Sequence, residues 1–177
     1  QTAMEMPKTH LSSFYRVEAI RGTVAEGRPL KLKFRPPLTD HESGSWNQKQ
    51  LREWYRKSNF EPEEAVLFQC YRGETASDNQ LAIYRELSQV LPELKCYWGV
   101  SDGSVDTPEG VTPLIIGSKE WYRVLGSARY LCNNIEFDAF FERRPYQKFL
   151  QTFHGHAFKS MGKTFWRTKD YGPTEVT

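Results

Sequence analysis

His154 and Gly155 follow directly on Lys148-Phe-Leu-Gln-Thr-Phe153, a short segment with the apolar composition of a buried strand. A histidine side chain titrates at about pH 6.5 when unperturbed, so at neutral pH its imidazole is available to accept a proton. Gly155 allows the backbone to turn sharply and a ligand to approach closely. The pair indicates general-base chemistry at a strand end, and a histidine that only packs there is the structural alternative.

A second candidate site is the loop of residues 71–79, which lies between the apolar segment 65–70 and a helical pattern. Backbone amides at the start of a helix attract anions, and the planar guanidinium of Arg72 suits phosphate. The sequence has no G-x-G-x-x-G or Walker-A pattern, so neither a dinucleotide nor a P-loop nucleotide is indicated. A helix capped by Ser77 or Asp78 beside a solvated arginine is the alternative. The substrate-binding candidates in this loop are Arg72, Gly73, Ser77, Asp78 and Asn79.

Amide and basic side chains supply a third set of candidates. Asn133 and Asn134 follow another apolar segment, where they either hold the hydroxyl groups of a polyol or form the Asx turns common after strands. His156 is either a second group of the site or an exposed loop residue. Lys159 belongs to a set of basic residues interleaved with aromatic ones, which either lines a groove for a phosphate-rich chain or forms a solvated face. The other basic residues of this set are Arg143, Arg144, Lys148 and Lys163.

The elements that must position these residues alternate along the chain from residue 64 onward. Short apolar runs, typical of strands covered on both faces, predict strands at 65–70, 96–100, 111–116, 129–132 and 148–153. Helices are predicted to begin at Ser77 or Asp78 and at Ser118. This order predicts an α/β domain, a Rossmann-like parallel sheet with flanking helices and right-handed crossovers. Because ligands bind at the carboxyl edge of such sheets, we expect the three candidate sets to share one crevice.

The first 60 residues have a different pattern. Residues 14–20 and 29–34 alternate apolar and polar side chains, which predicts a small antiparallel strand pair, a β-hairpin. An exposed linker at 39–45 then leads to an amphipathic helix at 48–58 that we expect to dock on the following domain. The predicted organisation is therefore an appendage at 1–60, the Rossmann-like domain at 61–163, and the start of a linker at 164–177.

Composition narrows the class of protein. The chain of 177 residues carries 38% hydrophobic and 26% charged residues, which fits a globular domain. No apolar run has the length of a membrane-spanning helix. A net charge of +2 argues against a general nucleic-acid binder. Three widely spaced cysteines, Cys70, Cys96 and Cys132, predict buried reduced thiols in a cytoplasmic protein and no metal site.

Taken in order, these segments resemble the CDP-glycerol glycerophosphotransferases, the bacterial family that polymerises polyol phosphates into teichoic acids and capsules. The helix start Ser77-Asp-Asn-Gln-Leu-Ala-Ile-Tyr84 is similar to the family's S-D-N-P-x-A-I-Y, with Gln80 where proline is usual. The segment Arg143-Arg-Pro-Tyr-Gln-Lys-Phe-Leu-Gln-Thr-Phe-His-Gly155 resembles K-R-x-x-Q-x-Y-L-Q-T-W-H-G. The family continues H-G-T-P-L-K, whereas this chain has His156 and Ala157. The resemblance covers about residues 64 to 163.

The resemblance implies one half of a GT-B fold and a transferase that moves glycerol phosphate, or a related polyol phosphate, from a CDP-activated donor. His154 would be the general base, and a hydroxyl of a growing, lipid-linked teichoic-acid or capsule polymer would be the acceptor. No metal or other cofactor is implied. The enzyme would be peripheral at the inner face of the bacterial plasma membrane. The chain would be the acceptor-side half, inactive without a donor-binding domain that follows it.

Two alternatives stay open from the sequence. One is a GT-B glycosyltransferase domain that uses a nucleotide sugar. The other is a non-catalytic Rossmann-like binding module in which His154 is structural.

Overall fold

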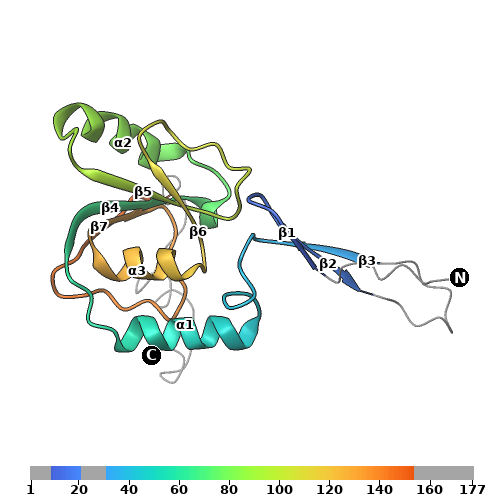
Figure 1. The fold of residues 1–177 in the computed structure, drawn as a ribbon. Coiled ribbons are helices and arrows are strands. Elements are labelled where there is room, and N and C mark those ends of the chain that lie inside the picture. Colours follow the sequence, from blue (N-terminus) through green and yellow to red (C-terminus); the bar gives the residue numbers. More distant parts are fainter. Residues whose placement is uncertain (1–8, 21–30, 154–177) are drawn as a thin grey trace, which may run out of the picture.

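The main body of the protein is a five-stranded sheet with helices on both faces (Figure 1). The computed structural model describes residues 9–20 and 31–153. Within them the sheet order is β6-β5-β4-β7-β8, and all four pairings are parallel. The predicted Rossmann-like α/β fold is thereby confirmed. The strands are β4 (Glu63–Gln69), β5 (Lys95–Val100), β6 (Thr112–Ile115), β7 (Ala128–Asn133) and β8 (Lys148–Gln151).

Within the described residues, three α-helices cover this sheet. The helix α2 (Asp78–Val90) lies on one face, and α1 (Ser45–Lys57) and α3 (Lys119–Ser127) lie on the other (Figure 1). The predicted helix starts are confirmed, and the Ser118 side chain caps α3 by accepting a hydrogen bond of 3.1 Å from the Trp121 amide. The predicted cap of α2 is wrong in detail, because Ser77 precedes the helix but its side chain makes no capping bond.

The packing of the central strand β4 explains why its residues 65–68 form a continuous apolar run. Ala65 and Leu67 pack against the face covered by α1 and α3, whereas Val66 and Phe68 pack against the α2 face. All four side chains are buried, as expected for a parallel strand covered on both sides. On the α2 face the Phe68 ring stacks on Trp98 of β5, with ring centroids 5.2 Å apart.

The expected docking of the amphipathic helix is confirmed by α1. Tyr55 is fully buried, and its hydroxyl donates to the Glu142 carbonyl at 2.9 Å. Gln48 donates to the Gly117 carbonyl at 2.8 Å and accepts from the Tyr122 hydroxyl at 3.0 Å. The basic Arg56 and Lys57 lie in the last turn of α1. Their positive charges interact favourably with the negative end of the helix dipole.

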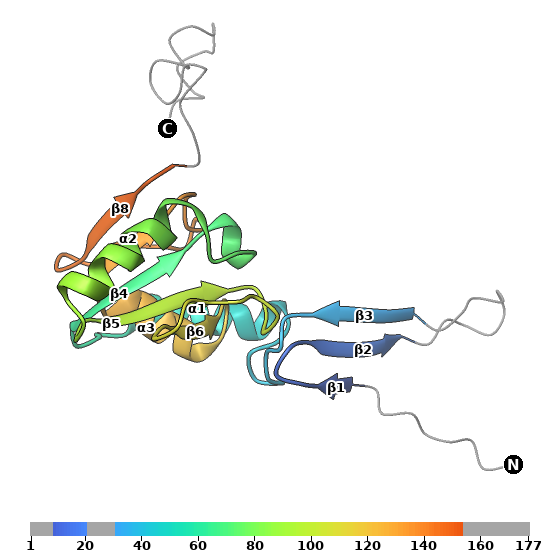
Figure 2. The same cartoon turned by 90° about the horizontal axis from the view of Figure 1, so that it is seen from above.

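A three-stranded antiparallel sheet extends from the body as an arm, formed by β1 (Thr9–Leu11), β2 (Arg16–Ile20) and β3 (Lys31–Arg35) (Figure 2). The predicted strand pair corresponds to β2 and β3, whereas β1 was not predicted. The buried Arg16 holds the base of the arm through an ion pair of 2.6 Å with Asp40 and a hydrogen bond to the Leu38 carbonyl. One face of the arm exposes Leu32 and Phe34.

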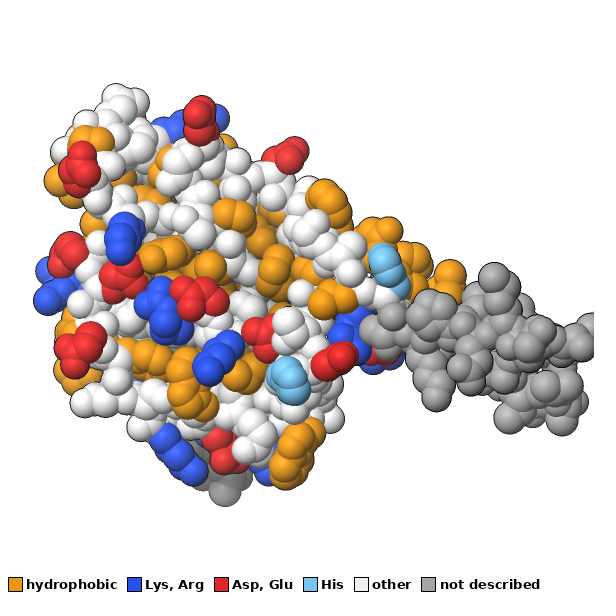
Figure 3. Space-filling model, in the orientation of Figure 1, with side chains coloured by type: hydrophobic (Ala, Val, Ile, Leu, Met, Phe, Trp, Pro, Cys, Tyr) orange, Lys and Arg blue, Asp and Glu red, His pale blue; other side chains and the backbone are white. Residues whose placement is uncertain are grey.

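The surface carries charges of both signs (Figure 3), and the three cysteines lie in the interior. Acidic and basic side chains are interspersed over the face shown in Figure 3. In the described part of the chain, no helix has the length and apolarity needed to cross a membrane. Cys70, Cys96 and Cys132 are buried and free, as predicted. Burial, and then the nearby Cys70, raise the pKa of the Cys132 thiol to about 12, so this side chain is not a thiolate at neutral pH.

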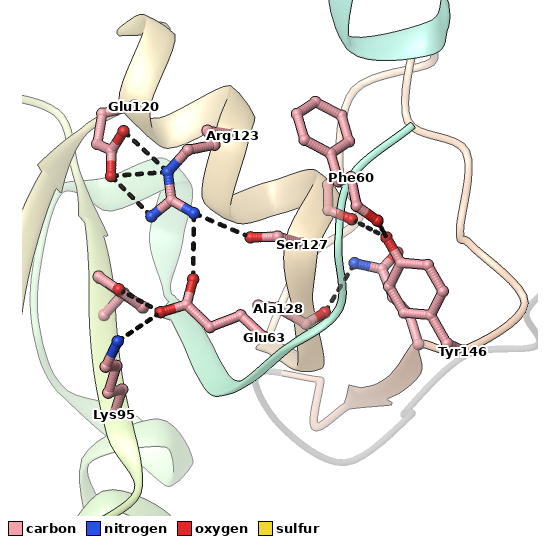
Figure 4. A network of polar contacts seen from close by, with 11 residues as sticks. Phe60, Glu63, Lys95, Glu120, Arg123, Ser127, Ala128 and Tyr146 are labelled. Carbon is pink, nitrogen blue, oxygen red and sulfur yellow. Dashed lines mark hydrogen bonds and ion pairs between the residues drawn. The ribbon is translucent and has the colours of Figure 1, made fainter. Parts of the chain in front are cut away.

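A polar network closes the amino edge of the sheet (Figure 4). The Glu63 carboxylate accepts hydrogen bonds from the Tyr97 hydroxyl at 2.8 Å, Arg123 at 3.1 Å and Lys95 at 3.2 Å. Arg123 also pairs with Glu120 at 2.7 Å. Burial acts to raise the pKa of Glu63, but the three hydrogen bonds outweigh it and the net pKa is lowered from the ordinary value of 4.5. The network lies opposite the edge where ligands bind, so we interpret it as structural.

We expect Glu63→Gln to lower the free energy of unfolding at pH 7 by about 1–2 kcal/mol, because charge-assisted hydrogen bonds are replaced by weaker ones. Since the folded-state pKa is lowered, this stabilisation is present above pH 4.5 and is lost as the pH falls through the folded-state pKa. Urea unfolding of the purified chain from pH 7 to pH 3 measures both effects. Glu64→Gln is the control, because its pairing with Arg129 is exposed. An equal loss in both variants would contradict the prediction.

Candidate functional site

The candidate site lies at the carboxyl edge of the sheet, between β4 and β7. The connection after β4 leads through α2 to β5 on one side, whereas β7 lies on the other side of β4. This is the topological switch point of the sheet, where α/β proteins bind ligands. The loop of residues 71–79 and the pair Asn133-Asn134 both lie there, so the structure brings the second candidate set together with the two asparagines of the third.

Three side chains join the two sides of the switch point, and we call Tyr71, Asp78 and Asn134 the switch-point latch. Asn134 is fully buried; its amide oxygen accepts from the Tyr71 backbone amide and its nitrogen donates to the Asp78 carboxylate, each at 2.9 Å. The Tyr71 hydroxyl donates to the same carboxylate oxygen at 3.2 Å. Partial desolvation, and then the bond to Asp78, raise the pKa of Tyr71, which keeps it a neutral donor.

The backbone around the latch is unusual. Among the described residues, the non-glycine residues with positive φ are Tyr71 at 45°, Arg72 at 57°, Asp78 at 63° and Phe153 at 57°. All four lie at the carboxyl edge of β4 and β8 or at the start of α2. Residues other than glycine rarely adopt this left-handed backbone conformation. Where they do, the surrounding structure holds them in it, and they are often found at functional sites. The geometry therefore favours a functional role for this edge.

Gly73 fixes the loop against the end of β5. Its φ is +85°, its amide donates to the Cys70 carbonyl at 2.8 Å, and its carbonyl accepts from the Ser101 amide at 2.8 Å. The residue is buried, and a Cβ placed on it would lie 2.8 Å from the Ser101 nitrogen and 2.9 Å from the Val100 carbonyl carbon. Only glycine fits both the conformation and the space.

The Cys70 thiol organises the rest of the same loop. Its sulfur donates to the Thr75 carbonyl at 2.9 Å and accepts from the Ser77 amide at 3.4 Å. The Ser77 hydroxyl lies 2.6 Å from the Thr75 hydroxyl, so it helps to hold the loop, and it makes no capping bond to α2. The loop is thus held at both ends before α2 begins.

The other predicted residues of this edge have different surroundings. Arg72 and Asn79 are exposed, so they are open to a ligand. Asn133 is buried and forms the Asx turn given as its alternative, since its side-chain oxygen accepts from the Ile135 amide at 3.3 Å. The residues predicted after β8, namely His154, Gly155, His156 and Lys159, lie outside the described residues.

Sequence reasoning missed Gln80 and Thr152, which link α2 to the end of β8. Gln80 is fully buried, and its side-chain nitrogen donates to the Thr152 hydroxyl at 2.8 Å. The Thr152 backbone amide donates to the Asn133 carbonyl at 3.1 Å, so β8 is tied to β7 at the same place. The one indication available in the sequence was that Gln80 occupies a position where the resembling family has proline.

An apolar groove of about 380 Å³ opens elsewhere, on the α2 face of the sheet. Its walls include Ile83 and Leu87 of α2 and Tyr130 and Leu150 of the sheet. Lys148 is the one described candidate residue in its lining, and the lining as a whole offers few polar groups to a ligand. We therefore place the candidate site at the switch point. Across the described ranges, no group of three or more His, Cys, Asp or Glu residues has metal-binding geometry.

Comparisons with known proteins agree with this architecture. A 98-residue stretch is 26% identical to the teichoic acid poly(glycerol phosphate) polymerase of Bacillus subtilis (strain 168), covering 54% of this chain and 13% of that protein. The wall teichoic acid polymerase TagF superposes with a TM-score of 0.57 at 20% identity, covering 61% of this chain and 27% of that one. TagF soaked with CDPG gives 0.58 at 19% identity, covering 61% and 28%.

The chain therefore spans less than a third of the length of these relatives, and the structural likeness establishes the fold alone. The family model for CDP-glycerol:poly(glycerophosphate) glycerophosphotransferase matches residues 53–174, which include the switch point and the His154 segment. This match covers more than half of the sequence. The chain belongs to the CDP-glycerol:poly(glycerophosphate) glycerophosphotransferase family.

Proposed function

We propose that the chain is the acceptor-side half of a transferase that moves glycerol phosphate, or a related polyol phosphate, from CDP-glycerol to a hydroxyl of a growing teichoic-acid or capsule polymer. The observation that carries the proposal is the family match over residues 53–174, because it spans both the switch-point loop and the segment after β8. We call this chain together with a following donor-binding domain the longer enzyme. Its acceptor would be lipid-linked, and the enzyme would act at the inner face of the bacterial plasma membrane.

His154 is the general base in this proposal. The sequence places it two residues after Thr152, whose amide is bonded to the end of β7 beside the switch point. Its neutral imidazole takes the proton of the acceptor hydroxyl while that oxygen forms a bond to the β-phosphorus of CDP-glycerol. The bond from this phosphorus to the bridging oxygen breaks, and CMP leaves with the electron pair.

The switch-point loop supplies the electrostatics of the proposed reaction. Phosphoryl transfer depends mainly on positioning and on neutralising negative charge. The exposed Arg72, held in an unusual backbone conformation by Gly73 and the latch, is a charged donor suited to phosphate. The remaining predicted contacts, Asn79, Gly155, His156 and Lys159, would surround the acceptor. No metal or other cofactor is part of the proposal.

The experiment is an assay of CMP release by the longer enzyme with CDP-glycerol and a polyol-phosphate acceptor. We expect acceptor-dependent CMP release, and no turnover by the 177-residue chain alone, because the donor site would lie in the following domain. UDP-glucose in place of CDP-glycerol tests the alternative of a nucleotide-sugar glycosyltransferase. Release of UDP but not CMP would reject the proposal, and turnover by the 177 residues alone would reject the division into halves.

A further inference from the structure

Two buried polar side chains converge above Gly99, on the face of the sheet that α3 covers. A Cβ placed on Gly99 would lie 2.9 Å from the Gln69 side-chain oxygen and 3.1 Å from the Trp121 indole nitrogen. The side wall of this space is a carbon atom of Ile116, at 3.4 Å from the same point. Gln69 is only 5% exposed and Trp121 only 3%. Because Gly99 is a glycine, no side chain separates the two polar atoms.

Neither of these polar atoms is satisfied within the described part of the chain. The Gln69 oxygen accepts no hydrogen bond there, and the Trp121 nitrogen donates none. A buried polar group without a partner lowers stability, so such groups in proteins are nearly always bonded to something. Since both atoms lie close to 3 Å from one point, a single bridging group can reach both of them with hydrogen bonds of ordinary length.

The same row of the sheet continues toward β7. Gln69 pairs in register with Gly99 of β5 on one side and with Asn133 of β7 on the other. Leu67 and Leu131, two residues earlier in their strands, pack on the α1 and α3 face, so Gln69 and Asn133 project toward that face too. Among the residues that the structure describes, the side-chain nitrogen of Asn133 is also buried without a partner. One acceptor and two donors therefore lie along the carboxyl edge.

The chemistry of these atoms selects a neutral hydroxyl group. The Gln69 oxygen needs a donor and the Trp121 nitrogen needs an acceptor, and a hydroxyl is both at once. An ionised phosphate oxygen would satisfy the indole but leave the Gln69 oxygen without a donor, whereas an ammonium group would do the reverse. Ile116 offers an apolar contact to the carbon that carries the hydroxyl. With the Asn133 donor alongside, the row fits a ligand that has more than one hydroxyl.

We propose that Gln69, Trp121 and Gly99 form a hydroxyl-binding subsite for a polyol, with Asn133 as an additional donor. The inference rests on the proposed function, since it assigns the subsite to the polyol-phosphate acceptor. Ile116 also borders Gly73, so the subsite lies beside the switch-point loop. The hydroxyls of the ligand are bound by neutral groups in the subsite, and its phosphate charge is left to the basic side of that loop.

The test is a titration of the purified, isotopically labelled chain with glycerol 3-phosphate, followed by the NMR signal of the Trp121 indole N–H. The signal is identified by its loss in Trp121→Phe. We expect it to shift and saturate, because the indole gains a hydrogen-bond acceptor. Propyl phosphate, which has the same carbon chain and phosphate but no free hydroxyl, should not move it. Gln69→Leu removes the acceptor and Gly99→Ala places a methyl group in the subsite, so each should weaken binding at least ~10-fold.

The melting temperature distinguishes a binding role from a structural one. Gln69→Leu replaces a buried, unsatisfied amide oxygen with an apolar group, so the melting temperature should stay the same or rise while binding is lost. Gln89→Leu, the same substitution at an exposed position of α2, is the matched control and should leave both properties unchanged. Loss of binding only in step with a lower melting temperature, in both Gln69→Leu and Gly99→Ala, would show a structural role and overturn the inference.

Three other results would overturn it as well. No shift of the Trp121 signal with glycerol 3-phosphate would mean that the space holds at most a water molecule. An equal shift with propyl phosphate, or wild-type affinity in both Gln69→Leu and Gly99→Ala, would show that hydroxyl binding does not occur there. Each of these results leaves the proposed function standing if the longer enzyme releases CMP. Binding as expected, in a longer enzyme that releases no CMP, would reject the proposed function and keep the subsite.

Discussion

Replacing His154 with alanine in the longer enzyme is expected to lower turnover of CDP-glycerol by at least ~100-fold, the range that a general base contributes. The acceptor hydroxyl would then have to lose its proton to water during attack on phosphorus. Arg72 and the other charged and amide groups of the edge would still bind the substrates, so the KM for CDP-glycerol should change little. CMP release measured against donor concentration separates the two parameters.

A control variant accompanies this expectation. His41→Ala is the matched control, because His41 is exposed in the loop before α1. If His154→Ala turns over at a near-normal rate while remaining folded, His154 is a structural residue at the end of β8 and the base lies elsewhere.

Gly73→Ala is expected to have the largest effect on stability of the substitutions considered. The left-handed φ of +85° costs an alanine about 1–2 kcal/mol. The new Cβ would also lie 2.8–2.9 Å from backbone atoms of Val100 and Ser101, which are fixed by the sheet and cannot move as a flexible side chain does. Together these effects should lower the free energy of unfolding by about 3 kcal/mol or more. Urea unfolding of the purified chain measures the loss.

Gly44→Ala separates the two contributions. Gly44 has nearly the same φ, +89°, but no atom lies within 4 Å of the position its Cβ would take. The alanine variant should therefore lose only the conformational part, about 1–3 kcal/mol for its extended backbone conformation with positive φ. An equal loss of unfolding free energy in Gly44→Ala and Gly73→Ala would contradict this prediction. It would mean that the loop after β4 can shift to accommodate the new Cβ without cost, and that the contact between Gly73 and Ser101 does not hold the loop against β5.

The sheet could be predicted from sequence because its central strands are covered on both faces. Because both faces are buried, Ala65 to Phe68 form one apolar run, and the helix starts at Asp78 and Lys119 follow small polar residues. Parallel pairing places the carboxyl ends of all the strands at one edge of the sheet. The switch-point loop and Asn134 could therefore be expected to lie close together. The strand β1 was missed because three residues, Thr9-His-Leu11, are too short to show a period.

The interactions within the candidate site could not be predicted in the same way. Sequence patterns assign Asn134 to a strand end but do not reveal that its amide meets Asp78, far away in the chain. The left-handed Phe153 has no sequence signature, because aromatic residues normally avoid positive φ. Gln80 differs from the family motif, yet only the fold shows that its amide reaches Thr152. The boundaries at residues 60 and 163 stay predictions.

The central position of β4 also determines the order in which the body can form. During synthesis β4, α2 and β5 emerge together, and they can pair through contacts between near neighbours in the chain. The other side of β4 must wait for β7, whose Tyr130 pairs with Val66. Until the ribosome has released residues 128–133, an apolar strand edge stays open to pairing with other chains. Slowing translation between residues 100 and 133 should therefore increase aggregation of the nascent protein, whereas the arm, with its short-range pairing of β2 and β3, should be insensitive to it.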